Sequence, residues 1–507
     1  MTHDDAFLQA IIEDPDDDAP RLLYADWLEE RGDPRGEFIR VQCALAGMDE
    51  YDPRRWDLAA REKELLASHS EKWLEPLTTA SAYFTFRRGF LDHVTLSVRT
   101  LLDHAHQLLR VGPPPGLQML EAYGQVSSLL ACPFVSRLNR IGFFRGHALN
   151  VESFRLGVGD VELLASSDAL GKLTSLNLER NRIGSEAVGR LASAPWLAGL
   201  RDLNLSWCDV GAAGVEALAD CPNLTGLRQL DLSHNGLTAA AMQTLADADC
   251  LSGLWWLNLS VNAIDAGGAG ALALNPRLEE LDDLDLSRNP LGLGGASFLA
   301  QARGLRRLSR LRLNGADIGS AGAQALARSP IVENLKQLDL GNNRLFVRGA
   351  VELGRSPGLS ELQVLDLTGN EIGDEGAKAL AGSPHLAALR TLRLGVNGLR
   401  VWGLREITAS PHLSNLHTLD LHSNLLEDMG LQRLARWPGL AKVAVLDLMS
   451  NRIGDVGAKD FASSPHLSGL REVNLRGNAI GPEGIAALRS ALANRVDLDL
   501  QDNPEAK

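Results

Sequence analysis

The chain has 507 residues, of which 45% are hydrophobic and 5% aromatic, and its formal net charge is −14. This apolar content is enough for a long buried core, while the acidic balance argues against nucleic-acid binding, which needs a basic stripe for the phosphate backbone. No uncharged apolar run approaches the length needed to span a membrane, so we also expect no membrane association.

Cysteine usage indicates the compartment. The chain has five cysteines, an odd number without a CxxC pair, at Cys43, Cys132, Cys208, Cys221 and Cys250. This pattern favours free thiols in a reducing environment. The first residues, MTHDDAFLQAIIEDPDDD, show no signal peptide, and we expect a cytoplasmic protein.

An aspartate-rich stretch near the start has the spacing of part of a calcium loop. Asp14, Asp16 and Asp18 match positions 1, 3 and 5 of an EF-hand loop. That loop also needs Gly at position 6 and Glu at position 12, where this chain has Ala19 and Ala25. We therefore predict no metal at this stretch and no metal site elsewhere.

The same stretch is better explained as the start of a helix. The aspartates provide an N-cap and negative charge for a helix whose apolar stripe is Leu22, Leu23, Trp27 and Leu28. Gly32 ends this helix, and Asp33 with Pro34 starts the next one. The first 50 residues contain 14 acidic and 4 basic side chains, so most of the net charge lies here.

These N-terminal residues closely resemble the bacterial repeat-companion domain, a short module found in front of repeat arrays. The resemblance covers about the first tenth of the chain and rests on Phe7, Leu8, Ile11, the run DDDAPRLLYADWLEERGDPRGEFIRVQ and the later FRRGF. It implies an all-helical domain without a catalytic role. We place this domain at residues 1–50, followed by a helical linker and N-terminal cap at 51–88 that contains an amphipathic helix at 53–76.

Residues 89–172 read as irregular leucine-rich repeats. The segments LDHVTLSV (91–98), LQMLEA (117–122) and RLNRIGFF (137–144) are predicted strands, with a helix at 101–109 between the first two.

Residues 173–507 carry a regular repeat of 27 residues with the pattern LxxLxLxxNxL. Its third leucine recurs thirteen times, from Leu178 to Leu500. This periodicity predicts an α/β fold, a right-handed leucine-rich repeat solenoid with a curved parallel sheet inside and helices outside. The helical half of each unit, as in IGDEGAKALAGSPHL, resembles the ribonuclease-inhibitor-like class. With the three irregular strands, we expect about sixteen strands.

Two repeats depart from the motif at its asparagine position. Cys208 replaces the asparagine of the second regular repeat, where its S–H group is a weak substitute donor for the amide. Ala316 replaces it in the sixth and leaves that turn without a side-chain donor, so we expect a looser turn.

Strand residues that alternate with the buried leucines are predicted to face the concave surface. The column that begins at Asn177 is rich in aspartate and is interrupted by Arg312 and Arg393. Each arginine is either a ligand for a phosphate or carboxylate group or a means of relieving crowding between aspartates on the neighbouring strands. For Arg312 those neighbours are Asp285 and Asp339.

Aromatic residues mark a candidate partner site on the same face. Trp256 lies in a concave column with Trp255 beside it, while Trp207 and His234 lie at strand exits of two preceding repeats. Tryptophan is a frequent interface anchor because it provides a large contact area at low entropic cost. The alternative is that these rings are incidental or pack on neighbouring side chains.

A possible second patch is formed by Trp402, Met429 and Val456, which share one column in three successive repeats and are predicted to lie on loops leaving the sheet. They either form a binding surface or pack within the rim. Three histidines, His385, His412 and His466, fall in the recurring SPHL corner and are interpreted as repeat consensus.

The sequence has no recognisable enzyme signature, so we predict no catalytic residues and no cofactor. We expect a non-enzymatic scaffold that binds a protein partner on its concave face. The alternative is a regulator of an enzyme, because the ribonuclease-inhibitor-like resemblance allows a nuclease inhibitor or a GTPase activator. Charges on the last strand, at Asp497 and Asp499, are expected to discourage edge pairing and keep the chain monomeric.

Overall fold

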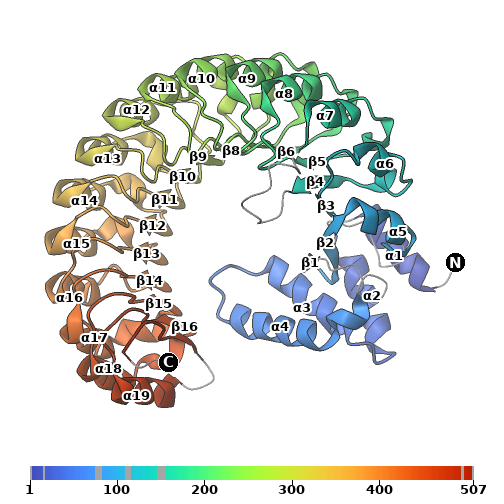
Figure 1. The fold of residues 1–507 in the computed structure, drawn as a ribbon. Helices are drawn as coiled ribbons and strands as arrows, with labels where there is room; N and C mark the ends of the chain where they lie inside the picture. The colour runs from blue at the N-terminus through green and yellow to red at the C-terminus, as the bar shows by residue number, and fades with distance from the viewer. Residues whose placement is uncertain are drawn as a thin grey trace. The chain divides into compact units, whose positions relative to one another are not determined.

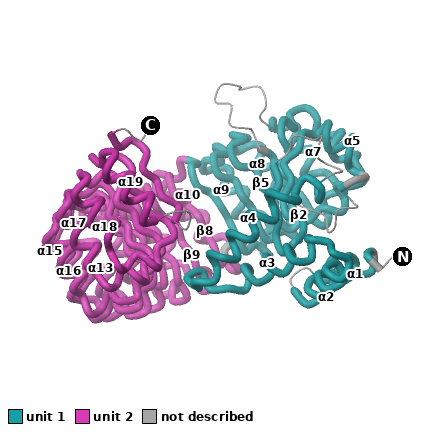
Figure 2. Tube along the Cα trace, turned by 90° about the horizontal axis from the view of Figure 1, so that it is seen from below, with its two compact units in different colours: residues 1–235 teal, residues 236–507 magenta. Residues whose placement is uncertain are grey.

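The computed structural model describes residues 3–14, 17–74, 83–108, 116–144, 156–492 and 496–504. The chain divides into two compact units, residues 1–235 and residues 236–507, and each is described by itself (Figure 2). Within the described ranges, no helix is both long enough and apolar enough to cross a bilayer.

Unit 1 begins with four helices: α1 His3–Glu13, α2 Ala19–Glu29, α3 Arg35–Gly47 and α4 Arg54–Trp73. The aspartate run precedes α2, and its N-cap is Asp18, as expected from the run, but Asp18 makes no side-chain cap hydrogen bond and the first turn has no acidic residue. Oδ1 of the preceding Asp17 accepts the N–H of Ala19 at 2.9 Å. Asp33 likewise accepts the N–H of Arg35 at the start of α3, at 2.9 Å. Asp16, which the calcium-loop pattern includes, lies outside the described residues.

A hairpin joins these helices to the repeats. It consists of β1 Tyr83–Arg87 and β2 Phe90–Ser97, which pair antiparallel. Phe90 belongs to the apolar core of α1, α2 and α3, and Phe86 packs on the core of α3 and α4. Between them, a Cβ at Gly89 would lie 2.1 Å from Cγ1 of Ile39, so only glycine permits this approach. The FRRGF motif therefore attaches the helical module to the first repeat.

The irregular repeats follow the predicted order. Their elements are α5 Val98–Leu108, β3 Gly116–Leu120, α6 Val126–Leu130, β4 Arg140–Phe144 and α7 Val158–Ala165. Unit 1 then continues with β5 Ser175–Asn177, α8 Gly184–Ala192, β6 Asp202–Asn204, α9 Gly211–Ala219 and β7 Gln229–Asp231. Strands β2 to β7 pair in parallel, each with the next along the chain.

Unit 2 repeats one strand and one helix. Its strands are β8 Trp256–Asn258, β9 Asp283–Asp285, β10 Arg310–Arg312, β11 Gln337–Asp339, β12 Val364–Asp366, β13 Thr391–Arg393, β14 Thr418–Asp420, β15 Val445–Asp447, β16 Glu472–Asn474 and β17 Asp497–Asp499. Its helices are α10 Ala239–Ala246, α11 Ala266–Ala273, α12 Gly292–Ala300, α13 Gly319–Ala327, α14 Phe346–Gly354, α15 Gly373–Ala381, α16 Val401–Ala409, α17 Glu427–Ala435, α18 Asp455–Ala462 and α19 Pro482–Leu492. The parallel strands line the inner side of the unit's curve and the helices its outer side (Figure 1).

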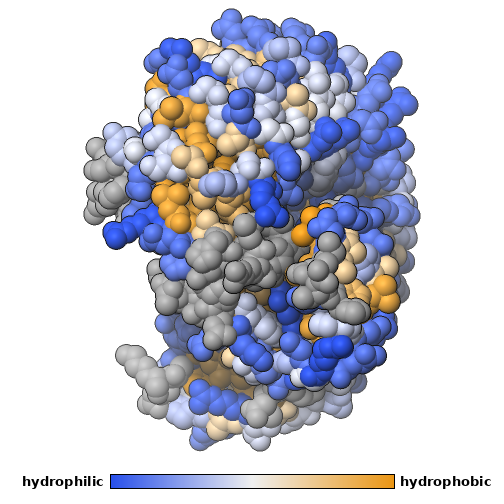
Figure 3. All heavy atoms as spheres, turned by 90° about the vertical axis from the view of Figure 1, so that its right-hand side faces the viewer, coloured by the Kyte–Doolittle hydropathy of each residue, from blue (hydrophilic) through white to orange (hydrophobic). Residues whose placement is uncertain are grey.

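The core lies between the strands and the helices, and the repeat motif accounts for it. In the repeat of β12, the motif leucines Leu362, Leu365 and Leu367 are fully buried, as is Ala377 on the inner face of α15. Some apolar surface remains outside, and Figure 3 shows it as patches between hydrophilic side chains on one face. Scattered exposure of this kind is normal for a folded chain.

The motif asparagine joins each repeat to its neighbours. Asn343 is fully buried, and its side chain makes five hydrogen bonds. Nδ2 donates to the carbonyl oxygens of Leu313 (2.7 Å), Leu340 (3.0 Å) and Gly341 (2.9 Å), and Oδ1 accepts the N–H groups of Ala316 (3.0 Å) and Ile318 (3.2 Å). Because two of its acceptors are in its own turn and its other partners are in the preceding repeat, one side chain satisfies the loop backbone of both.

The motif asparagines of successive repeats form a ladder of side-chain hydrogen bonds. Cys208 and Ala316, the two residues that replace an asparagine in this ladder, differ from each other in their contacts. The Sγ of Cys208 donates to the carbonyl of Leu178 at 3.0 Å, so the predicted substitution of thiol for amide is confirmed. Burial raises the pKa of this thiol to about 12, which keeps it protonated as a donor. Ala316 offers no such group, and the N–H of Leu291 donates instead to the carbonyl of Asn289 at 2.8 Å.

Completing the ladder should stabilise the protein. In Ala316→Asn, the new amide is placed to donate to the carbonyl of Leu286 and to accept the N–H of Leu291, as Asn343 does one repeat later. We expect the free energy of unfolding to rise by about 1 kcal/mol, measured by denaturant titration. The reverse change, Asn343→Ala, should lower it by about 1–3 kcal/mol. A less stable Ala316→Asn protein would show that the loop has no room for an amide.

Candidate functional site

The aspartate-rich concave column has a local structural role. In eleven repeats its Asn or Asp Oδ1 accepts the N–H of the residue two positions ahead, at distances of 2.8–3.0 Å. This is an Asx turn, which Asn and Asp form because their side chains are short acceptors. The turn ends each strand. Asp and Asn are therefore favoured in this column because they form the turn, and the acidic charge of the column accompanies that structural role.

Two of these aspartates have raised pKa values. Burial raises the pKa of Asp339, and the charges of Asp366 and Asp285 raise it further. Burial likewise raises the pKa of Asp447, with an additional contribution from Asp420. The concave face of unit 2 therefore carries carboxylates whose charged forms are partly disfavoured.

Arg312 is held by a carboxylate that the sequence analysis did not consider. Its register neighbours are Asp285 and Asp339 as expected, but its ion pair is with Asp283, at 2.6 Å and 3.2 Å to the two carboxylate oxygens. The Asp283 side chain is only 5% exposed, and Arg310 also approaches it, at 3.7 Å. The long arginine side chain thus reaches diagonally to the neighbouring concave column, while relief of crowding between Asp285 and Asp339 stays a prediction.

Arg393 has weaker contacts. It lies between Asp366 and Asp420 in the register, and its Nη1 is 3.9 Å from Oδ2 of Asp366. Strands β11 and β12 separate its strand from that of Arg312, so the structure does not bring the two arginines together.

Trp256 adjoins the Arg312 cluster in the strand register, and Trp255 precedes it along the chain. Trp256 pairs in register with Asp283, which in turn pairs with Arg310 on the next strand. Trp256 is half-buried, and Trp255 is 39% exposed. Reading the concave column of Trp256 across three repeats would have found Asp283 and Arg310, because the parallel register puts equivalent residues of successive strands on one face.

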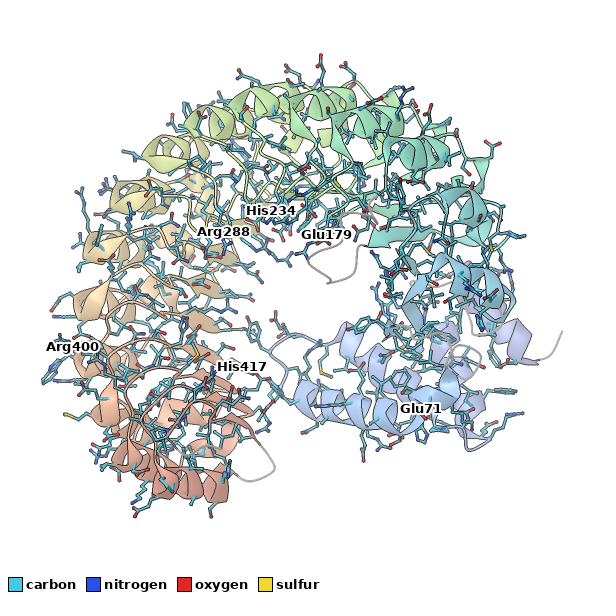
Figure 4. All side chains as sticks on the ribbon, in the orientation of Figure 1. Glu71, Glu179, His234, Arg288, Arg400 and His417 are labelled. Carbon is cyan, nitrogen blue, oxygen red and sulfur yellow. The ribbon has the colours of Figure 1, made fainter. Side chains whose placement is uncertain are left out.

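Trp207 and His234 form a second aromatic pair, in unit 1. Their rings stack with centroids 4.0 Å apart and planes 16° from parallel. His234 lies on the inner side of this unit, as does Glu179 (Figure 4). Both stacked residues have a left-handed backbone, with φ of 56° and 57°. The structure therefore joins these two predicted residues, while Trp255 and Trp256 belong to unit 2.

The left-handed backbone recurs at the equivalent position of every regular repeat, from Arg180 to Asp502. Even the β-branched Val261 and Val396 adopt it, both with φ of 54°. Such a conformation costs a non-glycine residue about 1–2 kcal/mol, so the surrounding repeat imposes it.

His422 is a further concave residue that the motif reading missed. Its Nδ1 lies 2.7 Å from Oδ1 of Asp420, and this hydrogen bond raises the pKa of His422, aided by the charges of Asp447 and Asp366 and opposed by burial. Its ring lies against Gly395, where a Cβ would be 2.1 Å from the imidazole. Glycine at that position makes room for the ring.

The predicted second patch lies on helices and not on loops. Trp402, Met429 and Val456 are in the first turns of α16, α17 and α18, and they are 63%, 62% and 59% exposed. The prediction of loop positions was wrong because each helix begins earlier in the repeat than the sequence pattern suggested. Exposure of this extent also argues against packing within the rim.

Two of the remaining histidines lie within repeated corners of the described chain. No group of three His, Cys, Asp or Glu side chains among the described residues could hold a metal ion. The N–H of His385 is bonded to the hydroxyl of Ser383, and His412 repeats this contact with Ser410, as expected for residues of a repeated corner. All five cysteines are buried, and none of them forms a disulfide.

The two arginines should differ in their contribution to stability. Arg312→Ala leaves the buried carboxylate of Asp283 with only a distant partner, and we expect the free energy of unfolding to fall by about 1–3 kcal/mol. Arg393→Ala removes a long, exposed contact and should change it by less than about 0.5 kcal/mol. Denaturant titrations of both variants test this, and equal losses would contradict the distinction.

His422 should make stability depend on pH. Its pKa is raised above the ordinary 6.5 in the folded chain, so its stabilising contribution is complete below pH 6.5 and is lost as pH rises through the folded pKa. The difference in melting temperature between wild type and His422→Asn should therefore shrink as pH increases above 6.5. Asp420→Asn keeps an oxygen acceptor but removes the negative charge that favours the protonated imidazole, and it should abolish most of this dependence. A difference that is constant with pH would contradict it.

A family model matches parts of this chain. The Leucine Rich repeat family model matches seven segments: residues 172–192, 200–219, 223–246, 306–327, 360–381, 441–462 and 466–488. No curated protein matches the chain.

Several solved structures are similar. An internalin (inlF) from Listeria monocytogenes is 21% identical, with 68% of this chain and 82% of that chain covered and a TM-score of 0.44. An LRR protein from Leptospira interrogans is 20% identical over 81% of this chain and 90% of its own, with a TM-score of 0.40. TLR13 in a complex with ssRNA13 is 19% identical over 77% and 51%, with a TM-score of 0.41. The matched segments identify leucine-rich repeats in this chain.

Proposed function

We propose that this protein is a non-enzymatic scaffold that binds a protein partner on the concave faces of its repeats. Stacked repeats create extended concave surfaces that serve for binding, which supports this general role. In unit 1 the contact residues are Trp207 and His234. In unit 2 they are Trp255, Trp256 and Arg312, with Arg393 further along the sheet.

The observation that carries this proposal is the cluster around Asp283 in unit 2. Its buried carboxylate holds Arg312 by two short contacts, and Trp256 lies on the adjacent strand. Interface hot spots are enriched in Trp and Arg, and side chains that are already held lose less entropy when a partner binds. Such a cluster is suited to recognise a protein surface.

The alternative role, regulation of an enzyme, uses the same surface. A captured partner with ribonuclease or GTPase activity, whose rate changes when this chain is added, would favour that role. We further propose that the chain acts as a monomer. We also propose a cytoplasmic location, because five buried thiols without a disulfide suit a reducing compartment.

The test begins with capture of a partner by the full-length chain, followed by affinity measurements with the isolated partner. Trp256→Ala should weaken binding by about 2 kcal/mol or more, because it removes an interface anchor, while thermal stability stays nearly unchanged. Leu293→Ala is the control, since it removes an exposed apolar side chain from helix α12 on the helical side and should leave this affinity intact. Unchanged affinity after replacement of both Trp255 and Trp256 would refute the site in unit 2.

A further inference from the structure

The helical side of unit 2 carries an ordered row of exposed apolar side chains. Trp402, Met429 and Val456 lie 27 residues apart, and each directly precedes a buried glycine of its helix: Gly403, Gly430 and Gly457. The three side chains are therefore at equivalent positions on neighbouring helices. Arg400, the N-cap of α16, is on the outer side of this unit, away from the strands (Figure 4).

The row has defined ends. The equivalent residues on the flanking helices are Glu375 in α15 and Glu483 in α19, both exposed. Three large apolar side chains, each about 60% exposed, thus lie in line with an acidic residue at each end. Clustered exposure of this kind differs from scattered exposure, since contiguous apolar surface marks interaction sites.

Basic residues lie beside the apolar row on three of the four helices from α15 to α18. Three positions further along each helix, the residues are Lys378, Arg405, Gln432 and Lys459. Lys378 lies 3.9 Å from Glu375, and Lys459 pairs with Glu483, both as exposed ion pairs. Exposed pairs of this kind contribute little to stability, so these cations can exchange their partners at low cost.

The spacing of the apolar row matches a helix. Packed helices lie about 8–10 Å apart, so the row advances by roughly that distance from one repeat to the next. Seven residues of an α-helix rise about 10.5 Å, so a helix laid across α16, α17 and α18 would present residues i, i+7 and i+14 to the three side chains. Tryptophan and methionine are suited to such contacts, because Trp provides area and Met adapts its shape.

We propose that this row is a docking site for an amphipathic helix of a protein partner. The helix has apolar residues at i, i+7 and i+14, acidic residues along the flank that faces Lys378, Arg405 and Lys459, and basic residues one heptad beyond each end, opposite Glu375 and Glu483. This site is separate from the concave faces and does not depend on their function.

The test uses the full-length chain and a fluorescently labelled synthetic helix with leucines at i, i+7 and i+14 and glutamates along one flank. Fluorescence anisotropy should show saturable binding. Met429→Glu should weaken it at least about tenfold, since a charge enters the middle of the apolar contact. Trp256→Ala should leave it unchanged. Because Met429 is exposed, circular dichroism should show the same thermal unfolding for Met429→Glu as for wild type.

Two control peptides test the spacing and the charge. A peptide of the same composition with leucines at i, i+5 and i+10 should bind at least about tenfold more weakly, as should one with lysines in place of the flanking glutamates. Absence of binding by the designed helix, equal binding of the controls, or an unchanged affinity in Met429→Glu would overturn the proposal. Wild-type dimers that dissociate in Met429→Glu, observed by sedimentation, would also overturn it and assign the row to a second copy of the chain.

Discussion

The buried asparagine of the repeat is the interaction on which the other features depend. A strand of three residues followed at once by a tight turn leaves several backbone groups buried without a regular ladder partner, and each such group costs about 1–3 kcal/mol if unsatisfied. One amide side chain, as at Asn343, bonds groups in two successive repeats. It thereby fixes the distance and register between strands, and the concave columns exist because the register is constant.

The surface charge of the concave face also results from the need to satisfy backbone hydrogen-bonding groups. Asn and Asp end the strands because their short side chains accept the N–H group two residues ahead. At Asp339 and Asp447 this places carboxylates on adjacent or nearby strands, and burial together with their neighbours raises their pKa values. Arg312 and Arg393 cannot form the turn bond, so these two repeats give up that contact for a positive charge. A change of charge at this strand-end position therefore also changes a backbone hydrogen bond, because only Asn and Asp form the turn contact.

Periodic features could be predicted from the sequence, because the 27-residue spacing fixes which residues share a column. The thirteen regular strands, the three irregular ones and the thiol contact of Cys208 are confirmed. Strand β1 was missed because it belongs to no repeat and pairs antiparallel with β2. The partner of Arg312 was missed because column neighbours are defined by Cα register, whereas a long side chain reaches across columns. The helix starts that carry Trp402 and its equivalents were displaced because helix boundaries are poorly marked by apolar periodicity alone.

The left-handed residue at each strand exit has a consequence for how this surface can change. Tryptophan, histidine, valine and arginine all occupy that position with nearly the same φ, although β-branched residues strongly disfavour it. The neighbouring hydrogen bonds hold the backbone there whatever side chain is attached. Diversity at this position therefore alters what the surface presents without altering where it is presented. A randomised library restricted to these exits would sample many chemical surfaces on one unchanged frame, and its members would differ in stability mainly through local backbone strain.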